Sequence, residues 1–270
     1  MRLADCGAFF SGKGKPESWR KGEPCMILLV EKEREKQRLL RLCEKTAYGC
    51  KIASIAASYG FDKSFACFWL DTESDVAFCM VDGAMLISGT ILHTEETRSF
   101  LKAVGAREIL CAVKNAEAMN LPADGTGDVL RKLAAEEVGG AAAEENVSIR
   151  EIFGLLEETG MVEEFEPFYL DLSHRLRHGG ARVITSRDKE GLRGCAVVSA
   201  ISEQAAILSA VAVREDCRRQ GVGSDLVRRA EAGLGGKWIY IFRDKDRNRE
   251  FYKSLGYGKA DTWVHIGQNG

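Results

Sequence analysis

The chain has 270 residues, of which 45% are hydrophobic and 29% are charged, and its formal net charge is -2 at pH 7. This composition is typical of a globular protein, and the usual domain size of about 150 residues predicts one or two domains. The small net charge and a pI near 6.2 argue against nonspecific binding of nucleic acid. No apolar run approaches the roughly 18 residues that cross a membrane.

The first residues of the chain, MRLADCGAFFSGKGK, lack the apolar core of a signal peptide. Nine cysteines are scattered along the sequence without a C-x-x-C pair, and the spacing of Cys43 and Cys50 is poor for zinc. Scattered thiols of this kind are typical of reduced core residues. We therefore expect a cytoplasmic protein without a metal site.

Residues 1–24 are rich in glycine and charge, so we expect a flexible extension there. The stretch 25–59 is expected to be largely helical, because EKEREKQR alternates in charge and is followed by an apolar stripe. Residues 47–57 are rich in small side chains and predict a second, tightly packed helix, which Gly60 can end.

Strands dominate the next part of the first half. Residues 76–88 are expected to split into two strands at Asp82-Gly83, since this dipeptide favours the type I′ hairpin turn. The other expected elements are a strand at 65–71, a helix at 95–104, a strand at 108–113 and a short helix at 115–119. The small and acidic residues of 136–146 then predict a linker; the alternative is a short frayed helix.

The second half repeats this plan at an offset of about 120 residues. Ser148 is a good N-cap with Glu151 three residues later, as in a capping box, and predicts a helix over 149–158. The expected elements that follow are a helix at 165–176, strands at 181–188, 194–202 and 206–213, a helix through 226–234, a strand at 237–242, a helix that ends at Gly256, and a closing strand.

A glycine turn follows the strand at 206–213. Arg218, Gly221 and Gly223 form an R-x-x-G-x-G pattern directly before the helix through 226–234. The first backbone N–H groups of a helix lack partners and its N-terminal dipole is positive, so glycines that let a ligand approach make an anion cradle. The order of strand, glycine turn and helix therefore predicts a phosphate-binding turn.

This stretch resembles the acetyl-CoA site of the GNAT family of N-acyltransferases, whose motif [QR]-x-x-G-x-[GA] follows the fourth core strand. Family members often carry a proline and an aromatic residue where this chain has Glu215 and Cys217. The sequence NREFYKSLGY at 248–257 is similar to the end of the same fold, where a helix carries a tyrosine before K-x-L-G-[FY]. The resemblance also implies that the strand at 237–242 splays away from the acetyl-CoA strand.

The resemblance implies a role for each part of the site, with acetyl-CoA as cosubstrate. Backbone N–H groups at a bulge in the fourth strand bind the acyl carbonyl and pantetheine arm, here Val211, Ala212 and Val213. Tyr252 is expected to be the general acid, since a phenol with a pKa near 10 can donate to a thiolate developing toward about 8.5; the alternative is a core tyrosine. The residues expected to hold the pyrophosphate are Arg218, Arg219, Gln220, Gly221, Val222, Gly223 and Ser224.

Other polar residues carry weaker expectations. Asn248 is either a cofactor contact or the N-cap of the last helix. No carboxylate lies in the strand AILSAVAV, where some relatives carry a base, and Glu203 is expected to be a solvated turn residue. Relatives often bind the acceptor at the helix before the strands, which here carries Asp171, His174 and His178; the alternative is that these are exposed polar residues.

In the first half, the position equivalent to the phosphate turn reads SGTILHTEET, residues 88–97, with two acids that would repel an anion. We therefore expect an α/β fold of two tandem GNAT-like mixed-sheet domains flanked by helices. The domain at 25–140 is expected to be a degenerate copy without a cofactor, and the domain at 147–270 to be intact and catalytic.

The favoured function is an acetyl-CoA-dependent N-acetyltransferase that moves the acetyl group directly to a primary amine of a small molecule or peptide. Two alternatives stay open: acetylation of a protein amine, and a noncatalytic acyl-CoA sensor or interaction protein. No nucleic-acid or membrane partner is expected. A dinucleotide-binding fold is disfavoured because no G-x-G-x-x-G follows an early strand. The sequence does not indicate the amine acceptor or the oligomeric state.

Overall fold

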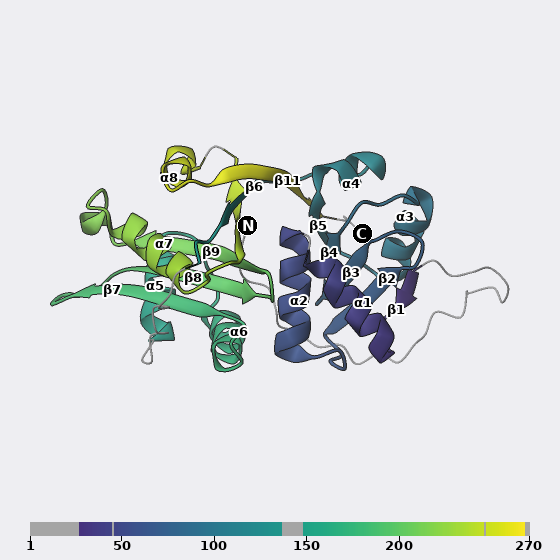
Figure 1. Cartoon of the computed structure of the whole chain (residues 1–270), viewed down its shortest axis with the longest axis horizontal. Coiled ribbons are helices and arrows are strands. Elements are labelled where there is room, and N and C mark those ends of the chain that lie inside the picture. The colour runs from purple at the N-terminus through teal and green to yellow at the C-terminus, as the bar shows by residue number, and fades with distance from the viewer. Residues whose placement is uncertain (1–26, 45, 137–147, 246, 268–270) are drawn as a thin grey trace. The chain divides into compact units, whose positions relative to one another are not determined.

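The structure is a computed structural model that describes residues 27–44, 46–136, 148–245 and 247–267 (Figure 1). The expected extension at 1–24 and residues 137–146 of the expected linker lie outside the described residues. The chain divides into two compact units. The N-terminal unit contains the described residues up to Gly127 together with 262–267, and the C-terminal unit contains those from Asp128 to Asp261.

The N-terminal unit begins with a short strand and two helices and continues with a strand meander. Its elements in chain order are β1 (Ile27–Leu29), α1 (Glu33–Cys43), α2 (Ala47–Tyr59), β2 (Ala66–Asp71), β3 (Ala77–Val81), β4 (Ala84–Ser88), α3 (Thr94–Ala103), β5 (Glu108–Ala112) and α4 (Val113–Ala118). The helix expected from residue 25 begins only at Glu33, because Ile27–Leu29 pair antiparallel with β2 instead. A strand of three residues exists through its partner, which local pattern does not reveal.

The C-terminal unit follows the same order. Its elements are β6 (Gly125–Leu133), α5 (Ile149–Glu158), α6 (Phe165–Arg177), β7 (Arg182–Asp188), β8 (Gly191–Ile201), β9 (Ala205–Val213), a 3-10 turn η1 (Glu215–Cys217), α7 (Val222–Ala232), β10 (Trp238–Asp244), α8 (Arg249–Ser254) and β11 (Gly258–Gly267). The first residues of β6 and the last residues of β11 belong to the N-terminal unit. The predicted helix over 149–158 is confirmed, and the Ser148 side chain caps it by accepting the N–H of Glu151 at 3.3 Å.

The predicted hairpin at Asp82-Gly83 is confirmed. Asp82 has φ of 49° and Gly83 has φ of 86°, so both central residues are left-handed, as a type I′ turn requires. The turn joins β3 to β4, which pair antiparallel from Ala77 with Ser88 to Val81 with Ala84. Local turn chemistry therefore determined the register of this hairpin.

Both units contain an antiparallel meander followed by a parallel strand that diverges. In the C-terminal unit β7, β8 and β9 are antiparallel neighbours, and β10 lies parallel to β9. The two parallel strands pair only from Trp238 with Ala205 to Tyr240 with Ile207, so the later residues of β9 and β10 separate. In the N-terminal unit β4 and β5 are likewise parallel over only three residue pairs, from Ala84 to Leu86. The splayed strands implied by the resemblance are present.

A bulge in β9 lies at Ser209. Val197 of β8 faces Ala210 and Val198 faces Leu208, so Ser209 between them has no opposite residue. Its hydroxyl donates to the Val197 carbonyl at 3.0 Å. The bulge was expected at Val211 to Val213, and this prediction is wrong, because those residues pair regularly with β8. The bulge lies two residues earlier in the strand.

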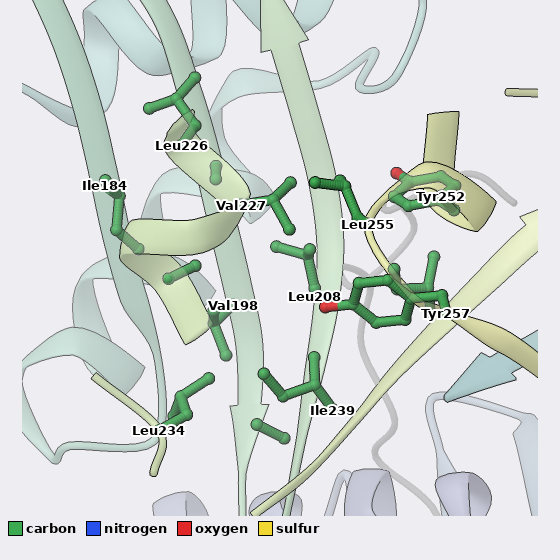
Figure 2. Close-up of a cluster of buried hydrophobic side chains, with 14 of the residues drawn as sticks. Ile184, Val198, Leu208, Leu226, Val227, Leu234, Ile239, Tyr252, Leu255 and Tyr257 are labelled. Carbon is green, nitrogen blue, oxygen red and sulfur yellow. The ribbon is translucent and has the colours of Figure 1, made fainter. Parts of the chain in front are cut away.

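The extra residue changes which side chains of β9 face α7. Before the bulge, Ala206 and Leu208 belong to the cluster that α7 and α8 cover, whereas after it Ala210 and Ala212 belong to the cluster that α5 and α6 cover. Strand side chains alternate between faces, so even-numbered residues would all share one face without the extra residue. Figure 2 shows the first cluster, with helix and strand side chains interleaved.

Each unit is completed by a strand from the other half of the sequence. β11, the C-terminal strand, pairs antiparallel with β5 from Trp263 with Ala112 to Gly267 with Glu108. β6 lies beside β10, where the Ala134 N–H donates to the Lys237 carbonyl at 2.9 Å. The division between Gly127 and Asp128 thus falls earlier than the linker expected at 136–146, because β6 packs with strands that come later in the chain.

Helices cover both faces of the strands in each unit. In the N-terminal unit α1 and α2 pack on a cluster that includes Phe68 and Cys79, and α3 packs on one that includes Phe78 and Ile109. Residues 78 and 79 therefore alternate between two cores, as expected for a strand buried on both sides. Among the described helices none is long and apolar enough to cross a membrane.

Candidate active site

The loop between β9 and α7 contains two left-handed residues. Arg219 has φ of 60° and Gly221 has φ of 81°, and α7 begins immediately afterwards at Val222. A left-handed residue next to right-handed ones turns successive N–H groups toward one point and makes an anion-binding concavity. A Cβ added to Gly221 would meet no heavy atom within 4 Å, so the backbone there is open. The loop is therefore a candidate anion site, and phosphate binding there stays a prediction.

Side chains of the loop hold it against the preceding strand. The Arg218 Nε donates to the Val213 carbonyl at 3.1 Å, and the Gln220 amide donates to the Asp216 carbonyl at 2.8 Å. Arg218, Arg219 and Gln220 are all exposed. The two guanidinium groups therefore add positive charge beside the start of α7, where the helix dipole also favours an anion.

The last residues of β9 direct their backbone groups to alternate sides. The Arg214 N–H donates to the Arg193 carbonyl of the β8 side at 2.8 Å. In an antiparallel pair the two backbone groups of a residue point to the same neighbour, and successive residues alternate. Val211 and Val213 therefore turn their N–H groups away from β8, toward the side where β10 diverges, whereas Ala212 turns its N–H toward β8.

Tyr252 lies on α8 and is buried, with 9% of its surface exposed. Its ring packs against the ring of Tyr257 at a centroid distance of 5.9 Å, and both rings belong to the cluster in Figure 2. Burial raises the pKa of Tyr252 to about 12, and the positive charge of Arg243 acts in the opposite direction. The phenol is thus protonated at neutral pH, although burial makes it a weaker acid than a free tyrosine.

Asn248 and Glu203 both lie in turns outside the helices and strands. Asn248 is the exposed N-cap residue of α8, with a left-handed φ of 53°, but its side chain makes no capping hydrogen bond. Glu203 lies in the turn between β8 and β9, where the Ser202 N–H donates to the Ala205 carbonyl at 2.8 Å. Neither observation points to a bound group.

Of the candidate acceptor residues, Asp171 and His174 lie on the second half of α6, and His178 directly follows the helix. The Asp171 carboxylate accepts from the Arg175 Nε at 2.7 Å, one turn further along the helix. The rings of His174 and His178 lie 4.3 Å apart between centroids. A second nitrogen of Arg175 donates to the Ser199 carbonyl of β8 at 3.4 Å, which ties this end of α6 to the strands.

A buried ion pair between Asp128 and Arg243 was not predicted from the sequence. Arg243 is 5% exposed at the end of β10, and its guanidinium binds the Asp128 carboxylate of β6. Lys259 Nζ also lies 2.7 Å from that carboxylate. The hydrogen bond from Lys259, together with that from Arg243, holds the pKa of the Asp128 carboxyl below its usual range. An arginine directly after the apolar strand WIYIF was the available signal.

In the N-terminal unit the backbone of the corresponding turn is hydrogen-bonded by a side chain of the same unit. Between β4 and α3 the buried Asn115 side chain accepts the Ile91 N–H at 3.1 Å and donates to the Gly89 carbonyl at 2.9 Å. A backbone N–H that a phosphate would need is thus already bonded. The expectation that the N-terminal unit carries no cofactor stays a prediction.

No group of three or more His, Cys, Asp and Glu side chains in the described part of the chain is arranged to hold a metal ion.

The comparison with protein families identifies the C-terminal unit. Residues 179–259 match the family model of the acetyltransferase (GNAT) domain, so the resemblance is confirmed for this part of the chain. The match begins just before β7 and ends at the start of β11, and it contains the loop of Gly221 and the helix of Tyr252. No curated protein matches the chain by sequence.

Solved structures are similar over both units. A GCN5-related N-acetyltransferase from Sphaerobacter thermophilus is 13% identical, with a TM-score of 0.56 over 91% of this chain and 96% of that one. A Drosophila protein is 12% identical, with a TM-score of 0.58 over 91% and 99%. A tandem GNAT protein from the clavulanic acid biosynthesis pathway is 12% identical, with a TM-score of 0.53 over 88% and 96%. At these identities the likeness concerns the fold, and the predicted fold of two tandem GNAT-like units is confirmed.

Proposed function

We propose that the chain is an acyl-CoA-dependent N-acyltransferase that uses acetyl-CoA and transfers the acetyl group directly to a primary amine. The observation that carries the proposal is the left-handed Gly221 at the start of α7, open to a ligand at the end of a strand whose neighbour diverges. An anion cradle beside a splayed strand pair suits a ligand with both phosphate groups and an extended arm. The GNAT match over residues 179–259 supports the same class of cosubstrate.

The residues of the C-terminal unit fit such a cosubstrate. The open space over Gly221 admits a phosphate close to the backbone, and a Cβ on Gly223 would lie 3.5 Å from the Phe251 ring, so a larger residue there would press on α8. Arg218, Arg219, Gln220, Val222 and Ser224 complete the proposed pyrophosphate site, with Asn248 as a further proposed contact. A CoA thioester supplies an acyl group activated by its thiol leaving group.

Acyl transfer to an amine forms a C–N bond and breaks the C–S bond, so the amine loses a proton and the departing sulfur gains one. Backbone N–H groups of Val211 and Val213 are placed on the open side of β9, where they can polarise the thioester carbonyl. Tyr252 holds a proton at neutral pH and is the proposed donor to the sulfur. Ala212 is not proposed as a contact of the thioester carbonyl, because the alternation of backbone groups directs its N–H toward β8.

The deciding experiment is a thiol-release assay with acetyl-CoA. The full chain is incubated with polyamines, amino acids, aminoglycosides and lysine peptides, and free CoA is measured against enzyme-free controls. Amine-dependent release supports the proposal and names the acceptor class, including a protein amine if only the peptides react. Tight binding of acetyl-CoA without release by any amine favours the noncatalytic sensor. Failure of acetyl-CoA to bind at all overturns the cosubstrate assignment.

A further inference from the structure

A chain of contacts runs from β6 to the helix that carries Tyr252. The Asp128 carboxylate binds the guanidinium of Arg243, and another nitrogen of Arg243 donates to the Arg247 carbonyl at 3.0 Å. The Arg247 N–H in turn donates to the Asp244 carbonyl at 3.2 Å and closes the turn before α8. Arg243 therefore bonds both the strand β6 and the segment from which α8 starts.

The segment after this turn leads directly to Tyr252. Asn248 has a left-handed backbone, and its carbonyl accepts the Tyr252 N–H at 3.2 Å, which makes it the first backbone partner of the tyrosine. A shift of the Arg247 carbonyl would therefore be passed to the start of α8 within one residue. The positive charge of Arg243 also acts to lower the pKa of the Tyr252 phenol, against the effect of burial.

We propose that Arg243, held by Asp128, is a positioning residue that sets the place of the Tyr252 hydroxyl. The inference rests on the proposed function for its catalytic meaning. Asp128 belongs to β6, which precedes the GNAT-matching region 179–259 in the sequence. The segment before that region thus supplies a residue on which the chemistry depends.

Burial explains why Arg243 is paired with a carboxylate. A guanidinium at 5% exposure loses most of its hydration, so it persists there as a charge only with a close anionic partner. Asp128 is that partner, and Lys259 on the same carboxylate is 56% exposed and stays largely in water. Removal of Asp128 would leave Arg243 to move toward solvent and away from the phenol, whereas removal of Lys259 would leave the pair intact.

The first test reads Tyr252 without reference to activity. The full chain is labelled with 3-fluorotyrosine, and the resonance of Tyr252 among the six tyrosines is assigned by Tyr252→Phe. Asp128→Asn and Arg243→Gln are expected to move this ¹⁹F resonance, Arg243→Lys to move it less, and Lys259→Ala to leave it in place. An unmoved Tyr252 resonance in both Asp128→Asn and Arg243→Gln overturns the inference, even if the protein proves inactive in every transfer assay.

The second test uses thiol release from acetyl-CoA with the amine that reacts fastest. Asp128→Asn is expected to lower kcat roughly tenfold with little change in the KM for acetyl-CoA, which is the signature of an interaction needed in the transition state. In the Tyr252→Phe background the same substitution is expected to cost no further rate, because residues that act as a unit are not additive. A rate loss in the double variant equal to the product of the two single losses would contradict the inference. Absence of release by the unmodified protein counts against the proposed function, and the fluorine measurement then decides the positioning role alone.

Discussion

The Arg218 guanidinium donates its Nε–H to the Val213 carbonyl at 3.1 Å, which joins the loop before α7, the proposed phosphate site, to the last residue of β9. We expect Arg218→Ala to weaken acetyl-CoA binding about tenfold, or 1.4 kcal/mol, since it removes both this tie and a positive charge. Equilibrium titration measures the affinity. Arg228→Ala is the matched control, because it removes an exposed charge from the body of α7 and is expected to leave the affinity unchanged.

Gly221 is expected to be the most sensitive position of the loop. Gly221→Ala forces a Cβ into a left-handed conformation at a cost of about 1 kcal/mol and places it over the open cradle, so affinity for acetyl-CoA should fall by at least tenfold, about 1.4 kcal/mol. Gly160→Ala has the same backbone strain, with φ of 67° and open space, but lies after α5. Equal losses of affinity in both variants would refute a specific role for Gly221.

Tyr252→Phe should separate catalysis from binding. Loss of a general acid lowers rates by roughly 10²-fold or more, whereas acetyl-CoA affinity should persist because the ring is retained. Tyr257→Phe is the control, since Tyr257 is a neighbouring buried tyrosine of the same cluster. Thiol-release rates that fall alike in both variants would mean that Tyr252 matters only as a core residue.

The same tyrosine predicts an alkaline loss of stability. Because burial raises the pKa of Tyr252 from 10.0 to about 12, its contribution is fully present below pH 10 and is lost as pH rises through 12, since the unfolded chain ionises first. Urea unfolding from about pH 8 to about pH 11 should show a smaller loss of unfolding free energy in Tyr252→Phe than in the unmodified chain. Equal losses of unfolding free energy with rising pH in the two proteins would contradict burial of this phenol.

Asp128 predicts an acidic loss of stability. Its lowered pKa means that the ion pair stabilises the folded chain at neutral pH and that the effect disappears as pH falls below the ordinary value of 3.8. Asp128→Ala should cost about 3 kcal/mol at neutral pH and progressively less in acid. Arg187→Ala breaks a half-exposed pair with Glu151 and should cost at most about 1 kcal/mol. Urea unfolding at neutral and acidic pH measures both.

The features that could be predicted from the sequence are those that depend on residues close together in the chain. The Asp82-Gly83 hairpin, the Ser148 cap and the loop of Gly221 depend on φ preferences and side-chain bonds within a few positions, so their sequence patterns were sufficient. The phosphate site proposed at Arg218–Ser224 follows from the same kind of local pattern and stays a prediction. The position of the bulge was not predicted, because which residue of β9 lacks an opposite residue is decided by the register with β8.

The sequence by itself determined most of the elements, the repeated plan of the two halves and the glycine turn before α7, because hydrophobic period and turn chemistry act locally. Only the tertiary structure decided that β11 completes the N-terminal unit, that β6 lies beside β10, and that Asp128 meets Arg243 across 115 positions of sequence. Backbone pairing and buried charge depend on which segments come together in space. Strand edges offer the same N–H and C=O groups to many partners, so the choice is made by packing of the whole chain.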